Sequence, residues 1–400
     1  MKKSLILFTL VVLTGFAWAQ AADSLDLPMP QFINPFYDSF SHNYLSAQAS
    51  GRGNTGIAYP GGVDSALLNP AAYAPDKAAM AIELLIKPPV DASGFPTTAK
   101  FMTTVPFGLF GIGGKLSDKL SGAIIYSQPQ AITLDDYSIE MNQGAYLIQR
   151  YPKYYLNQFT AAMAYHLGSL HFGLSLHNQL HFQDDVPFMR TFERIDDLKY
   201  VLRVEPGFLY EGEKGNVGFT VTPPSKVSWD LKYASYDTVL PLKVGIGTCL
   251  KHGSSKVFLD LDYEQFSAIH QDYMDRLRVK TGFEYTHKMM NYRLGYIYSP
   301  QVFDGVYRVP FNTSATADTS VAWIGVVSTS TVVKNDQHIL TGGMTMNHKY
   351  GSFNGSVMMS LSNKAPVTQV SLGLSLNLEA LKSKDFLRFP DAPKRKNSKH

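Results

Sequence analysis

Three things are scarce in this sequence: cysteine, charge and long apolar runs. Cys249 is the single cysteine among 400 residues, which excludes a framework of intrachain disulfides. Beyond the N-terminus, no segment approaches the ~18 uninterrupted apolar residues that a transmembrane helix needs. Charged residues make up 17% and hydrophobic residues 45% of the chain. An exported chain with this balance is expected to be either a large all-β soluble protein or a β-barrel of an outer membrane.

The N-terminus indicates export. Lys2 and Lys3 precede an apolar run from Leu5 to Phe16, and the small residues around Ala17 and Ala19 follow. A positive start, a short apolar core and small residues at a cleavage point are typical of a signal peptide. We predict one over residues 1–21, and an N-terminal membrane anchor is the alternative.

The formal net charge of +3 is unevenly distributed along the chain. Residues 382–400 hold seven Lys or Arg and two Asp, so the rest of the mature chain is slightly acidic. Such a basic tail fits nucleic acid or anionic lipid as a partner, or a solvated terminus beyond the last strand. We favour the solvated terminus and expect no nucleic-acid partner.

From residue 77 onward, apolar and polar residues alternate with a period of two, which is typical of strands with one apolar and one polar face. Two successive strands are predicted to place charges on one face, here named the charge ladder: Asp260, Asp262, Glu264, Arg276, Arg278 and Lys280. Opposite charges on paired strands stabilise each other. A charged row facing lipid would cost a few kcal/mol per residue near the bilayer midplane. We therefore expect the ladder to face a barrel lumen; in a soluble sandwich it would be a solvated face.

Short and long connections alternate along the same region. Tight turns are predicted near residues 117–121, 167–170, 211–216, 251–256, 287–291 and 349–352, and longer connections near 87–96, 128–156, 183–197, 223–239, 266–272, 300–336 and 362–366. Outer-membrane barrels have short periplasmic turns and longer extracellular loops. The pattern predicts an all-β fold, an outer-membrane antiparallel β-barrel of about 14 strands over residues 77–381, with both of its termini on the periplasmic side.

Residues 22–76 do not alternate. They end in "GNTGIAYPGGVDSALLNPAAYAP", a stretch rich in Gly, Ala and Pro. The lumen of a barrel of about fourteen strands is too wide for its wall side chains to fill. A compact segment of small residues folded inward would close it, because its glycines allow tight turns. We predict that residues 22–76 form a plug.

The quoted stretch resembles the N-terminal hatch of the FadL family of outer-membrane transporters for long-chain fatty acids and other hydrophobic compounds. The matching residues are Arg52, Gly53, Gly56, Ala58, Asp64, Ser65, Asn69, Pro70 and Ala71. Downstream, "LPLKVGIGTCL", "VFLDLDYEQFS", "VKTGFEY" and "YRLGYIYSP" resemble the middle strands of the family in order. The resemblance covers roughly residues 46–380. The chain departs from the family in its basic tail and in lacking the frequent Gly after Asn69-Pro70-Ala71, which weakens any statement about the substrate.

The resemblance implies a mechanism. A hydrophobic ligand would meet extracellular loops, enter an apolar pocket, pass the hatch and leave through a gap in the wall. The candidate ligand loop is 128–156, with the apolar residues Ile132, Leu134, Ile139, Met141, Leu147 and Ile148. Such residues are unusual on an exposed loop; a loop packed on its neighbours is the equal alternative. Expected partners are outer-membrane lipid and a hydrophobic small molecule.

Other functions remain open at this stage. FadL-like barrels in some secretion systems bind or hand over exported proteins, so an exported-protein or periplasmic partner is the main alternative. A wide mouth with a pocketless lumen would favour that role. A plain diffusion porin is disfavoured because the N-terminal segment would block it.

The sequence does not predict an enzyme. His171, His177 and His181 share parity on one strand, but at about 3.3 Å per residue they extend over roughly 33 Å, too far for one metal ion. No phosphate-binding Gly-rich loop, Cys pair or His-Glu helix motif occurs. We expect no cofactor and no metal.

Overall fold

The computed structural model describes residues 41–91, 100–102, 107–141, 145–150, 153–184, 196–231, 234–269, 273–302, 306–312, 325–331, 336–361 and 367–381. The predicted signal peptide (1–21), the first part of the predicted plug (22–40) and the basic tail (382–400) lie outside the described residues.

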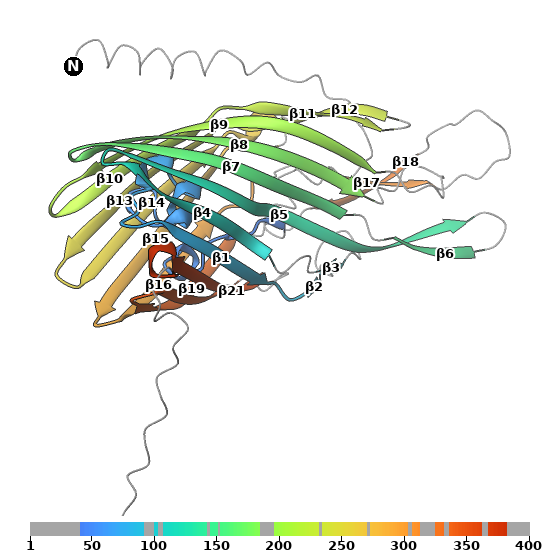
Figure 1. Cartoon of the computed structure of the whole chain (residues 1–400). Coiled ribbons are helices and arrows are strands. Elements are labelled where there is room, and N and C mark those ends of the chain that lie inside the picture. Colours follow the sequence, from blue (N-terminus) through green and yellow to red (C-terminus); the bar gives the residue numbers. More distant parts are fainter. Residues whose placement is uncertain are drawn as a thin grey trace, which may run out of the picture.

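Among the described residues, 14 strands close into one antiparallel barrel (Figure 1). They are β1 (Ala79–Ile86), β4 (Phe107–Ser117), β5 (Leu120–Met141), β7 (Lys153–Leu167), β8 (Leu170–Asp184), β9 (Asp197–Glu211), β10 (Gly215–Thr222), β13 (Lys243–His252), β14 (Ser255–Glu264), β15 (Arg276–His287), β16 (Met290–Ser299), β19 (Gln337–His348), β20 (Gly351–Ser360) and β21 (Thr368–Asn377). Strand β1 pairs with β21 as well as with β4, which closes the barrel. The predicted all-β barrel of about 14 strands is confirmed.

The two faces of the wall differ as the period-two pattern predicts. On β14, Phe258, Asp260 and Glu264 are buried on the inner face, whereas Val257 and Leu259 are exposed on the outer face. Exposed apolar side chains recur on the outer face of the other barrel strands, so the barrel has an apolar exterior. Its interior is largely polar, with an apolar cluster that includes Leu109 on β4 and Ile125 on β5. In a water-soluble protein the apolar side chains would be buried instead. This arrangement is typical of a barrel that spans a membrane.

Short turns lie at one end of the barrel and long connections at the other. At the turn end, β7 and β8 are joined by two residues, Gly168 and Ser169, and β15 and β16 by Lys288 and Met289. Extra strands lie toward the other end: β2 (Val90–Asp91), β3 (Lys100–Met102), β6 (Ala145–Arg150), β11 (Ser225–Leu231), β12 (Ala234–Leu240), β17 (Val306–Asn312) and β18 (Gly325–Thr331). The first residue of β1, Ala79, pairs with the last residue of β21, Asn377. The chain therefore enters and leaves the barrel at the end that carries the short turns.

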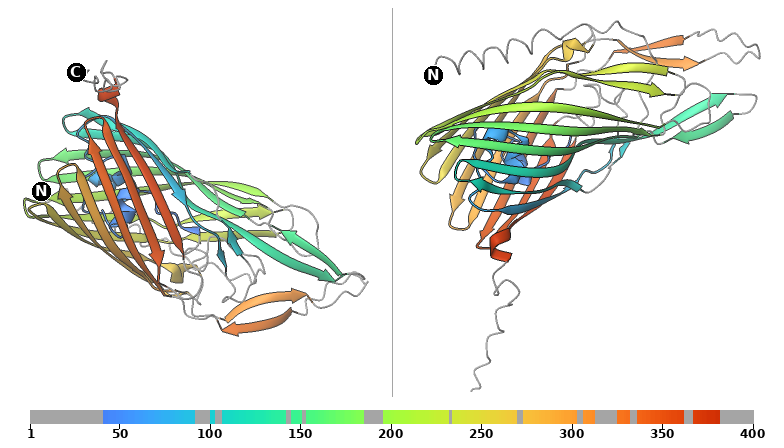
Figure 2. Two further views of the ribbon diagram at one scale, coloured as in Figure 1. Left: turned by 90° about the horizontal axis from the view of Figure 1, so that it is seen from below. Right: turned by 45° about the horizontal axis from the view of Figure 1, so that its top comes forward.

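The sequence prediction was wrong about residues 128–156, which are mostly strand rather than loop. Strand β5 continues to Met141, and its last part pairs with β6 as a hairpin that projects beyond the barrel (Figures 1 and 2). Gln130–Thr133 pair with Lys153–Leu156 of β7 and thus extend the wall. The error arose because Pro129 and a shift of register interrupt the alternation there.

The N-terminal segment, residues 41–76, lies inside the barrel (Figures 1 and 2, blue). It contains α3 (Ala47–Gly51) and the 3₁₀ turns η2 (Val63–Leu67) and η3 (Pro70–Ala72). The other short helical elements are η4 (Phe266–Ala268) and α4 (Leu378–Leu381). In the described part of the chain, no helix has the length and apolar character to cross a membrane.

Candidate functional site in the barrel interior

Two side chains shape the N-terminal segment locally. The Ser46 hydroxyl accepts a hydrogen bond of 3.1 Å from the Ala49 amide and so caps α3. The Asn69 Oδ1 accepts one of 2.9 Å from the Ala71 amide, and Pro70 occupies the first position of η3, where a missing N–H costs nothing. The Ser46 hydroxyl also bonds the Asp64 carboxylate, which ties α3 to η2.

Asn69 also connects the segment to itself and to the wall. Its Nδ2 donates to the carbonyl of Ile57 at 2.6 Å and to the carbonyl of Phe208 on β9 at 3.1 Å. The side chain is fully buried, so each of these bonds satisfies a group that water cannot reach. The Asn69 side chain therefore has two roles near the end of the segment: its oxygen stabilises the turn at Pro70, and its nitrogen bonds that turn to the barrel wall.

Glycines on the inner face of the wall let the segment lie directly on the strands. A Cβ at Gly173 of β8 would come within 2.1 Å of the Ala71 nitrogen, and one at Gly218 of β10 within 2.1 Å of the Ile57 carbonyl oxygen. The same close approach occurs at Gly111 and Gly113 of β4, Gly207 of β9, Gly247 of β13, Gly282 of β15, Gly295 of β16 and Gly343 of β19. Eight of the strands thus carry glycine where the segment touches them. The glycines make room for the backbone of the segment at Gly173, Gly218, Gly282, Gly295 and Gly343, and for its side chains at the other four positions.

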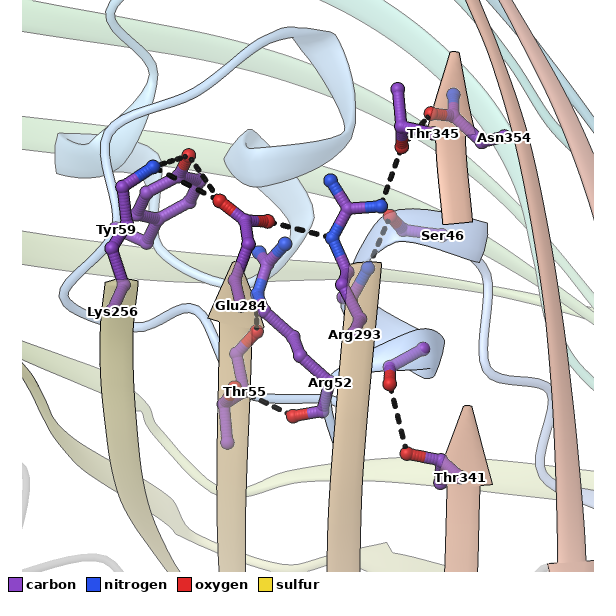
Figure 3. Close-up of polar contacts among 12 residues, drawn as sticks. Ser46, Arg52, Thr55, Tyr59, Lys256, Glu284, Arg293, Thr341, Thr345 and Asn354 are labelled. Atoms are coloured by element: carbon purple, nitrogen blue, oxygen red, sulfur yellow. Dashed lines mark hydrogen bonds and ion pairs between the residues drawn. The ribbon is translucent and has the colours of Figure 1, made fainter. Parts of the chain in front are cut away.

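A charged cluster on β14, β15 and β16 holds the segment on one side (Figure 3). Glu284 is fully buried and accepts hydrogen bonds from Arg293 at 2.7 Å and from Lys256 at 2.9 Å. Lys256 also donates to the Tyr59 hydroxyl of the segment at 2.9 Å. Such charge-assisted bonds are about twice as strong as neutral ones. Glu284 therefore holds the side chains of Arg293 and Lys256 in place, and Lys256 in turn bonds Tyr59 of the segment.

Arg52 is the segment's own contribution to this cluster. Its Nε donates to the Thr55 carbonyl at 2.9 Å, and the Thr55 hydroxyl donates back to the Arg52 carbonyl at 2.8 Å. The guanidinium carbon lies 4.8 Å from the centre of the Tyr59 ring and 5.3 Å from that of Phe258, at the distances of cation–π contacts. Arg52 thus stiffens the turn that contains Gly53 and Gly56.

Wall side chains accept hydrogen bonds from the segment's backbone at several points. The Asp260 carboxylate accepts from the amides of Gly56 at 2.7 Å and Ile57 at 3.1 Å. Glu83 on β1 accepts from the Ala47 amide at 3.1 Å, and the Thr341 hydroxyl on β19 accepts from the Gly53 amide at 2.9 Å. Backbone donors that no helix or sheet satisfies are therefore paired by the barrel.

The charge ladder faces inward and pairs across β14 and β15. Asp260 lies opposite Lys280, Asp262 opposite Arg278 and Glu264 opposite Arg276. Lys280 reaches Asp262 at 2.6 Å, and Arg276 Nε donates to Glu264 at 2.7 Å. Of the six residues, only Asp260 hydrogen-bonds the segment in the described structure; the other pairs lie farther toward the long-loop end.

On the opposite wall, a chain of mostly neutral side chains runs along β7 and β8. Tyr154 Oη lies 2.8 Å from His181 Nδ1, and the contacts continue through Gln179, Gln158 and Thr160 to His177. His177 Nε2 lies 3.4 Å from the Glu205 carboxylate on β9. The shared parity of His171, His177 and His181 correctly placed them on one face, and all three are buried on the inner side. The described residues include no group of three side chains that could hold a metal ion.

The wall itself is irregular beside the start of the segment. The pairing of β5 with β7 shifts register between Ser127 and Gln130, and β4 pairs with β5 only as far as Ser127. The segment enters here: the Asn43 amide donates to the Pro129 carbonyl at 2.8 Å, the Asn43 Nδ2 donates to the Gln128 carbonyl at 2.7 Å, and His42 bridges to Gln130. The N-terminal segment thus supplies pairing for β5 that the described part of β4 does not.

The residues of the predicted ligand loop are placed as follows. Ile132 is buried in β5. Leu134 pairs with Phe101 of β3, Ile139 pairs with Leu147, Ile148 with Ser138, and Met141 with Ala145 in the hairpin. The side chains of these five lie outside the described part of the structure.

Several contact residues were not singled out from the sequence. Glu284 shares the parity of Arg276, Arg278 and Lys280 on β15, so extending that pattern would have placed it inside the barrel. Lys256 likewise shares the parity of Asp260, Asp262 and Glu264 on β14. Arg293 on β16 and Thr341 on β19 were not singled out either. Tyr73 is fully buried against Gly113, and this burial raises the pKa of its hydroxyl.

Comparison with known proteins supports the architecture. No family model matches the chain, and no curated protein matches its sequence. Among solved structures it is similar to a FadL homologue of Pseudomonas aeruginosa, with a TM-score of 0.57, 10% identity, and coverage of 84% of this chain and 98% of that one. The fold is that of the FadL-type barrels. The toluene transporter TbuX of Ralstonia pickettii has a TM-score of 0.57 at 11% identity, covering 82% and 96% of the two chains.

A third FadL-type structure, the toluene transporter TodX of Pseudomonas putida, has a TM-score of 0.55 at 12% identity and covers 82% and 96% of the two chains. These structural neighbours are transporters and channels, not enzymes. Identities this low establish a common fold. The resemblance seen in the sequence is therefore confirmed at the level of the barrel.

Proposed function

We propose that this chain is a bacterial outer-membrane protein that takes up hydrophobic small molecules, with residues 22–76 as its plug and residues 1–21 as a removed signal peptide. Its apolar exterior supports a membrane position, because only a closed barrel or helices can cross lipid. Structures of the same fold are described as toluene transporters and a monoaromatic hydrocarbon channel.

The observation that carries the proposal is the contact of the N-terminal segment with so many strands. A segment seated on eight glycine-bearing strands leaves little room for an open aqueous bore. The polar interior on both walls is also a poor path for an apolar solute, because polar groups would have to be desolvated. A diffusion porin is accordingly disfavoured, and the route should avoid the axis of the barrel.

The route we propose is sideways, between β4 and β5. Between Ser127 and Gln130, where the pairing of β5 with β7 shifts register, β5 is bonded to Asn43 and His42 of the segment and not to the described residues of β4. Withdrawal of His42 and Asn43 would open the wall there, and an apolar molecule could pass directly into lipid. Capture would take place at the long-loop end, where Ile132, Leu134, Ile139, Met141, Leu147 and Ile148 belong to β5 and the β5–β6 hairpin. Toluene-sized aromatics and long-chain fatty acids are both within this proposal.

The side exit can be tested by linking the segment to the wall with a disulfide. In a Cys249→Ala background, His42→Cys and Gln130→Cys stand opposite each other in an antiparallel bridge, where Cα atoms are about 4.5–5.5 Å apart and a disulfide can form. Whole cells producing this variant are given radiolabelled toluene or oleate. We expect uptake with reductant and its loss after oxidation.

The matched control is Thr286→Cys with Asn291→Cys, an opposed pair on β15 and β16 far from the proposed exit. Its uptake should not respond to oxidation. Equal uptake by the oxidised and reduced exit variant would disprove the side exit. No uptake of either compound by the parent protein would refute the transport function itself.

A second candidate is binding of exported proteins at the cell surface. The β5–β6 and β17–β18 hairpins project beyond the barrel (Figure 2), and each has a strand edge that no other described strand pairs. Such edges can add a strand from another chain. Purification in mild detergent distinguishes the two. Co-purified apolar small molecules favour uptake, and an empty barrel with one defined exported protein favours binding.

A further inference from the structure

The turn end of the barrel divides into two halves of different charge. On the β13–β20 side, three consecutive turns carry His252, then His287 and Lys288, then His348 and Lys349, all exposed. We name these five residues the His–Lys rim. The turns are neighbours because β13 through β20 pair in succession. All three turns lie in the described part of the chain, and none of them contains an acidic residue.

The other half of this end has mixed charge. The β4–β5 turn combines Lys119 with Asp118, and Lys115 lies close by near the end of β4. The β9–β10 turn combines Lys214 with Glu213. The β7–β8 turn, Gly168 and Ser169, has no charge. The cationic character is therefore a property of one sector, not of the end as a whole.

The rim lies at the edge of the apolar exterior. Leu250, Met289 and Met346, each within three residues of a rim residue, are more than half exposed at 61%, 58% and 51%. Tyrosines accompany the rim residues: the Tyr285 and His287 rings stack with centroids 6.4 Å apart, and the Lys349 ammonium lies 4.6 Å from the Tyr350 ring centre. Tyrosine beside Lys or His, just beyond an apolar band, is the arrangement found at the headgroup level of a bilayer.

In the β15–β16 turn, a lysine occupies a position whose backbone conformation is unfavourable for it. Lys288 has a φ of 54°, a conformation that favours Gly, Asn or Asp.

We infer that the His–Lys rim binds the phosphate groups of anionic phospholipid in the periplasmic leaflet of the outer membrane. This inference rests on the membrane position given under the proposed function, but not on the transported compound. Cations near an anionic leaflet are attracted by its surface potential within about a Debye length. Imidazole and ammonium groups on three adjacent turns can also donate hydrogen bonds to phosphate oxygens.

The experiment compares two double variants of equal charge change, Lys288→Gln/Lys349→Gln in the rim and Lys115→Gln/Lys119→Gln in the mixed half. Full-length protein in mild detergent is titrated with phosphatidylglycerol or phosphatidylcholine of the same chain length, and bound lipids are counted by native mass spectrometry. We expect the parent to prefer phosphatidylglycerol, the rim variant to lose about tenfold in apparent affinity for it, and the other variant to keep it. A His252→Gln/His287→Gln/His348→Gln variant should show a smaller loss.

Other results would overturn the inference. Equal losses in the two lysine variants would mean that only net charge matters, and a parent without preference would mean that no lipid site exists. Tighter binding of poly-L-glutamate than of phosphatidylglycerol would point to an acidic protein instead. Heat-modifiable migration in gels checks that each variant is folded. Hydrocarbon uptake by the same variants separates the two proposals, because uptake can fail while the lipid preference persists.

Discussion

The two walls that enclose the N-terminal segment contact it by different chemistry. On β14–β16, buried Glu284 and Arg293 and half-buried Lys256 form a charged cluster with Tyr59 and Arg52 (Figure 3). Glycines fit the segment to both walls, at Gly282 and Gly295 on this side and at Gly173 and Gly207 on β8 and β9. The polar side chains of β7 and β8 mostly bond one another. The comparison teaches that β14–β16 add buried charge to this fit, whereas β8 and β9 hold the segment mainly by shape.

We expect the largest effect on the position of the segment from Glu284→Gln, which removes the negative charge at the centre of the β14–β16 cluster. The change leaves buried Arg293 and half-buried Lys256 beside Arg52 without their counter-charge, and the loss of a buried partner typically costs about 3–5 kcal/mol. We expect the segment to detach from β14–β16. The native Cys249 reports this, because it is fully buried against Ala58, Ala71 and Ala72 of the segment. Its rate of labelling by a maleimide should rise about 100-fold, the equivalent of about 3 kcal/mol.

Glu205→Gln is the matched control for that measurement. Glu205 contacts His177 and Thr222 on the wall and, among the described residues, makes no hydrogen bond to the segment. Its loss should leave the labelling of Cys249 unchanged. A similar increase in both variants would show that any lost lumen carboxylate loosens the segment, and the contrast between the walls would then be wrong.

The sequence predicted one side of this comparison better than the other. Alternation is local, so the inward face of β14 and β15 and the pairing of the charge ladder followed from a few residues at a time. Which of those charges meet the segment did not follow, because Tyr59 and Glu284 are 225 residues apart. The glycines of β8 and β9 resembled ordinary small strand residues until the segment was seen to lie on them.

The errors also have a physical cause. Gln128 and Pro129 interrupt the alternation of β5, and without a tertiary partner such a stretch is indistinguishable from a loop. In the folded barrel, β7 pairs with Ser127 and Gln130 on either side of the stretch, and Asn43 donates to the carbonyls of Gln128 and Pro129. Non-local pairing thus decided the structure where the local pattern was ambiguous.

A smaller effect is expected from the shape side with Gly173→Ala. The new Cβ would approach the Ala71 nitrogen to 2.1 Å, and neither the strand nor η3 can move away cheaply, since Asn69 is bonded to β9. Overpacking of this kind costs about 1–3 kcal/mol. Urea unfolding in detergent micelles should show that loss, with a moderate rise in Cys249 labelling. Gly355→Ala is the control, because its Cβ would meet nothing closer than 3.8 Å; equal losses in both would mean that glycine matters here only for the strand.

The smallest effect should come from Thr160→Val in the neutral chain, and it sharpens the comparison most. The substitution keeps the shape of the buried side chain but removes the hydroxyl between His177 Nδ1 and Gln158 Nε2. Leaving these groups without their partner costs about 1 kcal/mol in the free energy of unfolding. Because none of the three residues bonds the segment in the described structure, Cys249 should remain as protected as in the parent. A destabilised barrel with a protected thiol would show that this wall supports the fold without holding the segment. Exposure of the thiol would instead mean that the hydrogen-bonded side chains of β7 and β8 help to position η3. The segment would then depend on both walls alike.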